Sequence, residues 1–298
     1  MAKFQNKDQY YKDNLQYNFL PFRFSDFDKN SKILSNMIGE FQLLPNSVFK
    51  DFVNKDLLDN NPFYSELRDK HFFTDTNTSV ALDLLPIKIR TKYQMLSNFT
   101  ALHIFVVSLR CEHSCPYCQV SRQSEDKNTF DMDEDKAEKA LNLVFQSPSQ
   151  NIKIEFQGGE PLLNFELIKF IVLKAIEIKP NEKNVSFVIA TNLALINEKI
   201  LEFCSKYNIL ISTSLDGPKE IHNKNRPRKG NNSYEKTIEG INLSRNYLGL
   251  DAVSALMTTT YDSLPKVNEI IDEYIKNKFS GIFLRPLSPH GFAIKTKS

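Results

Sequence analysis

The sequence predicts an α/β protein in which a small α+β domain precedes a partial (β/α)6 barrel of the TIM type. Two observations lead to this prediction. Strand-like apolar runs alternate with helix-like runs from residue 101 onward, and residues 1–95 lack that alternation. Strands that alternate with helices form βαβ units with right-handed crossovers and a parallel sheet. We therefore expect two domains, at residues 1–95 and 96–298.

In the first domain, strand-like pieces come before helix-like pieces. The strand-like pieces are RFSDF, KILSNM and FQLLP, and the helix-like pieces are NSVFKDFVNKDLL and FYSELRDKHFF. This order, in a stretch rich in Phe, Asn, Asp and Lys, predicts a small α+β domain. Residues 88–100 are interpreted as the connection into the second domain.

The second domain contains six strand-like runs, at residues 102–109, 152–156, 185–191, 209–215, 251–258 and 281–287. Helical periodicity predicts the intervening helices at residues 133–146, 165–178, 197–207, 233–248 and 264–278. Asp133 is suited to cap the first of these helices. A sixth helix would follow the sixth strand, where about a dozen residues remain. Six units that curve in one sense would form an open, three-quarter version of a (β/α)8 barrel.

Composition excludes several classes of protein. Hydrophobic residues make up 41% and charged residues 25%, and the net charge is only +2, so binding to nucleic acid is not expected. No run of about 18 apolar residues is present, so no transmembrane helix is expected. The first 19 residues lack the apolar core of a signal peptide. We therefore expect a cytoplasmic protein, in which clustered thiols indicate metal or redox chemistry rather than disulfides.

Unusual short segments follow the predicted strands. A cysteine cluster follows the first strand, QGGEP the second and SLDGP the fourth, while TN closes the third and RPLSPHG follows the sixth. Because parallel strands of such a sheet end at the same edge, these segments are expected to meet at one cavity.

Three of the four cysteines, Cys111, Cys115 and Cys118, have the spacing C-x3-C-x2-C. Three thiolates leave one position of a four-site metal centre unfilled, which fits a catalytic zinc ion or a [4Fe–4S] cluster with one open iron. A zinc knuckle that also uses His113 is an alternative, although His113 is crowded between two of the cysteines; cysteines that merely pack in a core are another. Cys204 lies in a helix-like run and is predicted to be a buried apolar residue.

The spacing C-x3-C-x2-C, with Tyr117 just before the last cysteine, resembles the signature of radical S-adenosylmethionine (SAM) enzymes. Residues 101–290 resemble the peptide-modifying kind. The segments LRCEHSCPYCQVSR, IEFQGGEPLLNF, ATN, STSLDGP, IHNKNRP and FLRPLSPHGFA carry the resemblance. They are most similar to the radical SAM maturase of the His-Xaa-Ser system, and more distantly to anaerobic sulfatase maturases.

This resemblance implies two cofactors, a [4Fe–4S] cluster on the three cysteines and S-adenosylmethionine on its open iron. One electron from the cluster would break a C–S bond and give a 5′-deoxyadenosyl radical that takes a hydrogen atom from the substrate. The resemblance implies that Gly158 and Gly159 let the backbone approach the amino group of the methionine moiety, and that Glu160 helps to hold it. Tyr117 would pack on the adenine side. For the GGEP segment, an ordinary Gly-Pro turn capped by Glu160 is the alternative.

Further candidates stand at the ends of the third and fourth strands. Thr191 and Asn192 are suited to hydrogen-bond the ribose or carboxylate of the cofactor, or to end the strand and cap a helix. Ser212, Ser214 and Asp216 alternate along one face with period two. The resemblance implies that Ser214 and Asp216 face the nucleoside or the substrate, and that Asp216 transfers a proton in catalysis, as an acid does in sulfatase maturases.

Two arginines are candidates for the methionine carboxylate. The segment IHNKNRP, with His222 and Arg226, matches a loop of the relatives, and Arg226 is suited to pair with the carboxylate bidentately. Arg285 at the end of the sixth strand is a similar candidate. For Arg226 a simple surface position is the alternative. Met257 on the fifth strand is predicted to lie in the core.

The expected partners are a peptide or protein precursor as substrate and an electron donor such as a flavodoxin or ferredoxin. The first domain would capture the precursor leader by strand addition, or would only shield the barrel. Relatives usually continue into a cysteine-rich extension, whereas no cysteine follows Cys204 here, so one cluster site is expected. The alternatives are a sulfatase-maturase-like oxidase of Ser or Cys, a catalytically silent precursor-binding subunit, and a zinc-binding structural module.

Overall fold

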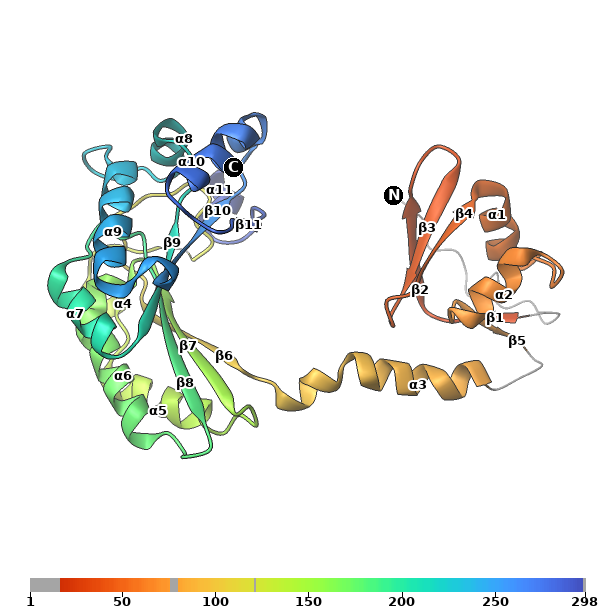
Figure 1. Ribbon diagram of the computed structural model, residues 1–298, viewed down its shortest axis with the longest axis horizontal. Helices are drawn as coiled ribbons and strands as arrows, with labels where there is room; N and C mark the ends of the chain where they lie inside the picture. Colours follow the sequence, from red (N-terminus) through yellow and green to blue (C-terminus); the bar gives the residue numbers. More distant parts are fainter. Residues whose placement is uncertain (1–16, 76–79, 121, 297–298) are drawn as a thin grey trace. The chain divides into compact units, whose positions relative to one another are not determined.

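The computed structural model describes residues 17–75, 80–120 and 122–296, which divide into two compact units with a boundary between Ser97 and Asn98 (Figure 1). Each unit has its own hydrophobic core. The first sixteen residues, where no signal peptide is expected, lie outside the described residues. Within the described part of the chain, no helix combines the length and the apolar character needed to cross a membrane.

The first unit is an α+β arrangement. Its elements are β1 (Tyr17–Phe19), β2 (Phe22–Asp26), β3 (Ser31–Asn36), β4 (Phe41–Pro45), α1 (Asn46–Asn54), α2 (Pro62–Asp69), β5 (Phe73–Asp75) and α3 (Val80–Lys92). Strands β2, β3 and β4 form an antiparallel sheet, and β1 pairs with β5. Tyr17 lies in the aromatic core, where its hydroxyl donates to the Phe52 carbonyl at 2.8 Å. The three predicted strands and two helices are confirmed.

Two details of the first unit differ from the prediction. The second helix ends before Phe73, because His71 adopts a positive φ of 61° that breaks the helical path, and Phe73 begins a strand. The segment interpreted as a connection contains the end of α3 and the 3-10 helix η2 (Gln94–Asn98).

The second unit is built on one parallel sheet of six strands. They are β6 (Leu102–Ser108), β7 (Asn151–Gly158), β8 (Asn184–Ala190), β9 (Ile209–Ser214), β10 (Val253–Thr258) and β11 (Phe283–Arg285). The strands lie in sequence order, with β6 at one edge and β11 at the other. All six predicted strands are confirmed, and the sheet is parallel as expected. Its curvature into a partial barrel stays a prediction.

Helices connect these strands, and a last short helix follows β11 (Figure 1). They are α4 (Lys127–Phe130), α5 (Glu134–Val144), α6 (Phe165–Ile178), α7 (Glu198–Lys206), α8 (Lys219–Asn225), α9 (Ser233–Leu248), α10 (Val267–Lys276) and α11 (Phe292–Thr296). The predicted helices are confirmed, and Asp133 caps α5 by accepting from the Lys136 amide at 2.8 Å. Helix α8 was not predicted, since its segment was expected to be a loop.

One face of the sheet is covered by helices, and the other face carries both polar and exposed apolar side chains. In β7, Ile152, Ile154 and Phe156 are buried against the helices, and Cys204 of α7 lies in the same core. The alternate residues Glu155 and Gln157 point to the opposite face, because side chains alternate along a strand. The residues that were predicted to be functional lie where this second face reaches the carboxyl ends of the strands.

Candidate active site

A cavity of about 150 Å³ lies at the carboxyl ends of the parallel strands. Ten of the predicted site residues line it: Cys111, Cys115, Tyr117, Cys118, Gly158, Gly159, Thr191, Asn192, Ser214 and Arg226. These residues come from the loop after β6, from the ends of β7, β8 and β9, and from the C-terminus of α8. Two further candidates, Ser212 and Arg285, line it as well, whereas Glu160 and Asp216 are 1% and 0% exposed and stand behind the lining residues.

The three clustered cysteines are free and half-buried, and all of them face this cavity. Burial raises the pKa of the Cys111 thiol well above its ordinary value and raises that of Cys115 to about 11. Neutral thiols must therefore lose protons when they bind metal, and a bound metal ion supplies the required stabilisation. Three soft sulfur ligands around one cavity fit a [4Fe–4S] cluster with one open iron.

The two glycines of the GGEP segment allow β7 to approach the start of the cysteine loop. The amide of Gly159 donates to the Ser108 carbonyl at 2.8 Å. A Cβ atom would lie 2.0 Å from that oxygen at Gly158, and 2.2 Å from the Arg110 carbonyl oxygen at Gly159. Only glycine allows this backbone contact. The glycines therefore fix where the cysteine loop leaves the sheet, besides lining the cavity.

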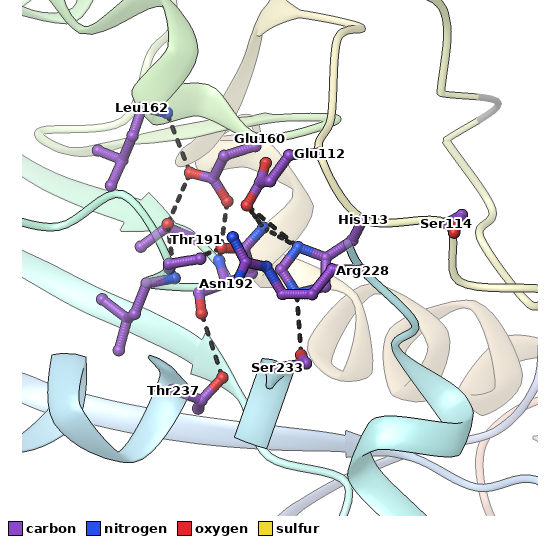
Figure 2. Close-up of polar contacts among 12 residues, drawn as sticks. Glu112, His113, Ser114, Glu160, Leu162, Thr191, Asn192, Arg228, Ser233 and Thr237 are labelled. Atoms are coloured by element: carbon purple, nitrogen blue, oxygen red, sulfur yellow. Dashed lines mark hydrogen bonds and ion pairs between the residues drawn. The ribbon is translucent and has the colours of Figure 1, made fainter. Parts of the chain in front are cut away.

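The expected exposure of Glu160 to the cavity is not observed. One carboxylate oxygen accepts from the Thr191 hydroxyl at 2.6 Å and from the backbone N–H of Leu162 at 3.0 Å. The other accepts from the backbone N–H of Asn192 at 2.9 Å (Figure 2). Burial and the nearby charge of Glu112 raise the pKa of Glu160, although the three hydrogen bonds act to lower it. Glu160 thus joins the end of β7 to the end of β8. Its predicted contact with the cofactor stays a prediction.

Asn192 joins the end of β8 to the cysteine loop (Figure 2). Its side-chain oxygen accepts from the Ala194 amide at 2.8 Å, which fixes the orientation of its amide group. The amide nitrogen donates to Glu112 Oε1 at 2.8 Å and to His113 Nδ1 at 2.9 Å. His113 Nε2 lies 2.8 Å from the Ser233 hydroxyl, at the start of α9. The N-cap of α7 is Asn197, so the alternative that Thr191 and Asn192 cap that helix is wrong.

A zinc site that uses His113 is not favoured by these contacts. A sulfur of Cys111, a carboxylate oxygen of Glu112 and a ring nitrogen of His113 do lie within 4.8 Å of one another. However, both ring nitrogens of His113 already contact protein groups, and the ring is buried with 3% exposure. His113 therefore holds the loop in place, and the three thiolates remain the metal ligands that the cavity offers.

Asp216 is buried behind the cavity as part of a charged cluster. It accepts from the Tyr117 hydroxyl, from Arg226 Nε at 3.1 Å and Nη2 at 3.2 Å, and from the Thr258 amide at 3.2 Å. Although burial opposes ionisation, the charge of Arg226 holds the pKa of Asp216 below its ordinary value. Strand β9 ends at Ser214, so the period of two that would turn Asp216 toward the cavity stops before it. Ser212 and Ser214 face the cavity as expected.

Arg226 lies between the cavity and the buried cluster around Asp216. It lines the cavity, yet its guanidinium is paired bidentately with Asp216 and lies 5.5 Å from the Tyr117 ring centroid. The alternative of a simple surface arginine is therefore wrong. Its pairing with the methionine carboxylate stays a prediction.

His222, on the unpredicted helix α8, links the Asp216 segment to the cysteine loop. Its Nδ1 accepts from the Asp216 amide at 3.3 Å, and its Nε2 lies 3.1 Å from the Ser233 hydroxyl and 3.4 Å from that of Thr237. The Ser233 hydroxyl also contacts His113. Glu112 and Ser233 were missed in the sequence, and nothing in the sequence relates Ser233 to His113, which lies 120 residues earlier.

Below about pH 6.5, His222 is expected to make stability depend on pH. Burial lowers the pKa of His222 to about 3. The charges of Asp216 and Glu235 oppose this shift, and those of Arg226 and His113 add to it. The folded state thus disfavours protonation, and stability is lost as pH falls from the unfolded-state pKa toward the folded one. From about pH 7.5 to about pH 5 the loss is about 2 kcal/mol. Urea unfolding of the unsubstituted protein and of His222→Gln checks this, and equal pH dependence in both would contradict it.

Comparisons with known proteins agree with this site. An uncharacterised protein of Methanocaldococcus jannaschii is 35% identical over 187 residues, 62% of each chain. The radical SAM cyclopropyl synthase TigE of Paramaledivibacter caminithermalis is 25% identical over 84% of this chain and 53% of its own. A cysteine-type anaerobic sulfatase-maturating enzyme of Clostridium perfringens is 31% identical over 60% of this chain and 49% of its own. The chain thus spans about half to two thirds of these relatives.

Among solved structures, native anSMEcpe with bound AdoMet shares the fold, with a TM-score of 0.56, 24% identity, and coverage of 63% of this chain and 51% of its own. The profile of the radical SAM superfamily matches residues 105–276, which include the cysteine loop and the strand ends around the cavity. Since this match covers more than half of the sequence, the chain belongs to the radical SAM superfamily.

Proposed function

We propose that this chain modifies a residue within a ribosomally made peptide or a protein. Members of its superfamily use a [4Fe–4S] cluster and S-adenosylmethionine, which together supply a 5′-deoxyadenosyl radical able to abstract a hydrogen atom. The observation that carries the proposal is the convergence of three free cysteines and several polar strand ends on one cavity. Similarity to sulfatase-maturating enzymes supports a peptide or protein as the substrate.

The cavity residues take the following proposed roles. Cys111, Cys115 and Cys118 hold the cluster. The backbone at Gly158 and Gly159, the polar groups of Thr191, Asn192 and Ser214, and the guanidinium of Arg226 bind S-adenosylmethionine, with Tyr117 beside its adenine. Glu160 and Asp216 act from behind, because their carboxylates hold Thr191, Asn192, Tyr117 and Arg226 in position.

Two substrate classes are proposed. The first is the precursor of a His-Xaa-Ser system, which the cysteine-loop and strand-end segments favour. The second is oxidation of a Ser or Cys residue in a protein, which similarity to the Clostridium perfringens enzyme favours. We also propose a sheet that curves as a partial barrel, a cytoplasmic location, and reduction by a flavodoxin or ferredoxin.

We further propose that the first unit captures the precursor by strand addition. Its antiparallel sheet has β2 and β4 at the edges, and an edge strand offers unpaired backbone groups to an extended peptide. Phe24 of β2 and Phe41 of β4 are 56% and 63% exposed, so apolar side chains accompany these edges. A unit that only shields the sheet is the alternative.

The experiment that tests the proposed function is an anaerobic assay of the reconstituted chain with dithionite and S-adenosylmethionine. Separate reactions receive a His-Xaa-Ser repeat peptide, and a sulfatase peptide with Cys or Ser at the modified position. We expect 5′-deoxyadenosine, together with a mass change in one of the peptides. A mass change in the sulfatase peptide alone would replace the first substrate class by the second. Bound peptide without any 5′-deoxyadenosine would instead indicate a silent binding subunit.

A further inference from the structure

Two arginines of the cavity lack an acidic partner among the described residues. Arg122 follows the cysteine loop and Arg285 ends β11, and both are half-buried in the cavity lining. In the described part of the chain, no ion pair or side-chain hydrogen bond reaches either guanidinium. Arg122 Nε is buried without a hydrogen-bond partner there, and its guanidinium carbon lies 5.1 Å from the Phe292 ring centroid.

Neighbouring arginines are paired. Arg110 forms two 2.7 Å contacts with Asp131, and Arg226 is bidentate with Asp216. Because a partly buried cation without a counter-ion is unfavourable, two unpaired guanidinium groups in one cavity indicate an anionic ligand. The planar fork of arginine is suited to a carboxylate.

The two arginines lie on one side of the cavity. The amide of Phe292 donates to the Cys118 carbonyl at 2.8 Å, and a Cβ atom at Gly291 would lie 2.5 Å from that oxygen. These contacts hold the segment after β11 against the loop that carries Arg122. The neutral polar side chains of Gln119 and Ser288 come from the same two segments and also line the cavity.

Arg285 and the residues that we assign to the methionine moiety stand at the ends of different strands. The two glycines of β7 and Thr191 after β8 lie across β9 and β10 from Arg285. We assign the carboxylate of S-adenosylmethionine to Arg226, which lines the cavity with Ser214, so Arg122 and Arg285 are left for a second anion.

We propose that Arg122 and Arg285 bind a carboxylate of the peptide substrate, from an Asp or Glu side chain close to the residue that is modified. This inference rests on the proposed function, because it concerns the substrate of the same cavity. It names acidic peptides as the substrate class. Arg285, which the sequence offered as a ligand of the methionine carboxylate, is thus assigned to the substrate.

Binding of labelled peptides to the full chain, reconstituted with its cluster and saturated with S-adenosylmethionine, tests the proposal. The probes are a fluorescein-labelled heptapeptide Gly-Ser-Asp-Ala-Asp-Ser-Gly and its counterparts with Asn or Lys in place of both Asp residues. Fluorescence anisotropy should show about tenfold tighter binding of the Asp probe than of the Asn probe at low salt, and a smaller ratio at about 0.5 M NaCl. Equal affinities, or no saturable binding of the Asp probe, would overturn the proposal.

Variants distinguish a carboxylate of the peptide from the carboxylate of S-adenosylmethionine as the ligand of the two arginines. In Arg122→Gln and Arg285→Gln the preference for Asp should fall to about twofold or less, while the dissociation constant of S-adenosylmethionine changes less than about twofold. Lys139→Gln, which removes one positive charge from the exposed face of α5, should leave both unchanged. Arg285→Glu should reverse the preference toward the Lys probe. Weaker binding of S-adenosylmethionine to Arg285→Gln, with the peptide preference intact, would assign Arg285 to the cofactor and overturn the proposal.

The same preparations distinguish this proposal from the proposed function. Formation of 5′-deoxyadenosine tests the function without reference to the probes. If the chain prefers the Asp probe and forms none, the anion site stands and the function fails. If it forms 5′-deoxyadenosine and does not discriminate the probes, the function stands and the anion site fails.

Discussion

Single replacement of Cys111, Cys115 or Cys118 by alanine is expected to remove the bound cluster and with it the cleavage of S-adenosylmethionine. Each cysteine faces the same cavity, and both ring nitrogens of His113 already contact protein groups, so the loop offers no free histidine in place of a lost thiolate. Loss of a direct ligand should exceed the effect of losing a group that only orients ligands, which is up to about 100-fold in metal affinity. Iron and sulfide per chain, and 5′-deoxyadenosine after dithionite reduction, are the measurements.

Cys204→Ala is the matched control, since it also removes one thiol. Cys204 lies in α7 with 0% exposure, within the hydrophobic core of the second unit. This variant should bind iron normally and lose about 1 kcal/mol of unfolding free energy, from poorer packing. Equal iron loss in all four variants would show that the iron is not held by the loop. Tight uptake of zinc in place of iron would support a zinc site in place of the iron–sulfur cluster.

Regular elements of the second unit could be predicted from local patterns. Helix α6 coincides with the predicted range of 165–178, because its apolar residues recur with helical spacing and bury Leu167, Ile171 and Ala175. Helix α8 could not be predicted in this way. Three of its four buried residues, His222, Asn223 and Asn225, are polar, so the apolar spacing that marks a helix is absent. Its contacts come from distant segments, such as the Tyr234 amide that donates to Asn223 at 2.8 Å.

Local patterns likewise predicted the position of some residues of the candidate site and not of others. Residues at the last positions of strands, such as Ser214 and Gly158, were placed in one cavity because parallel strands share their carboxyl edge. Residues just beyond the strands could not be oriented from the sequence, since the period of two ends with the strand. Glu160 and Asp216 both turn inward, where donors from neighbouring strands satisfy their carboxylates. Which donors reach them depends on tertiary packing.

Asp216→Asn is expected to destabilise the second unit and to loosen the cysteine loop. The side chain of Asp216 is fully buried and that of its partner Arg226 is 11% exposed. Removing one member of a buried pair leaves the other charge uncompensated, which costs about 3–5 kcal/mol. Because the pKa of Asp216 is lowered, its contribution is fully present above its unfolded-state pKa, and it is lost as pH falls from that value through the lower folded-state pKa. Urea unfolding near neutral pH measures the difference.

The same variant separates a positioning role of Asp216 from the catalytic role that the family resemblance implies. Asp216 accepts from the Tyr117 hydroxyl, and Tyr117 stands directly before the third cysteine ligand. If Asp216 positions the loop, Asp216→Asn should lower both stability and iron content. Tyr117→Phe keeps the ion pair and should lose about 1.5–3 kcal/mol, since its hydroxyl donates to a charged group. If Asp216 instead transfers a proton, Asp216→Asn should keep its iron and form 5′-deoxyadenosine while the peptide remains unmodified. That outcome would reject the positioning role, because a loosened loop cannot spare the cluster and still abolish peptide modification alone.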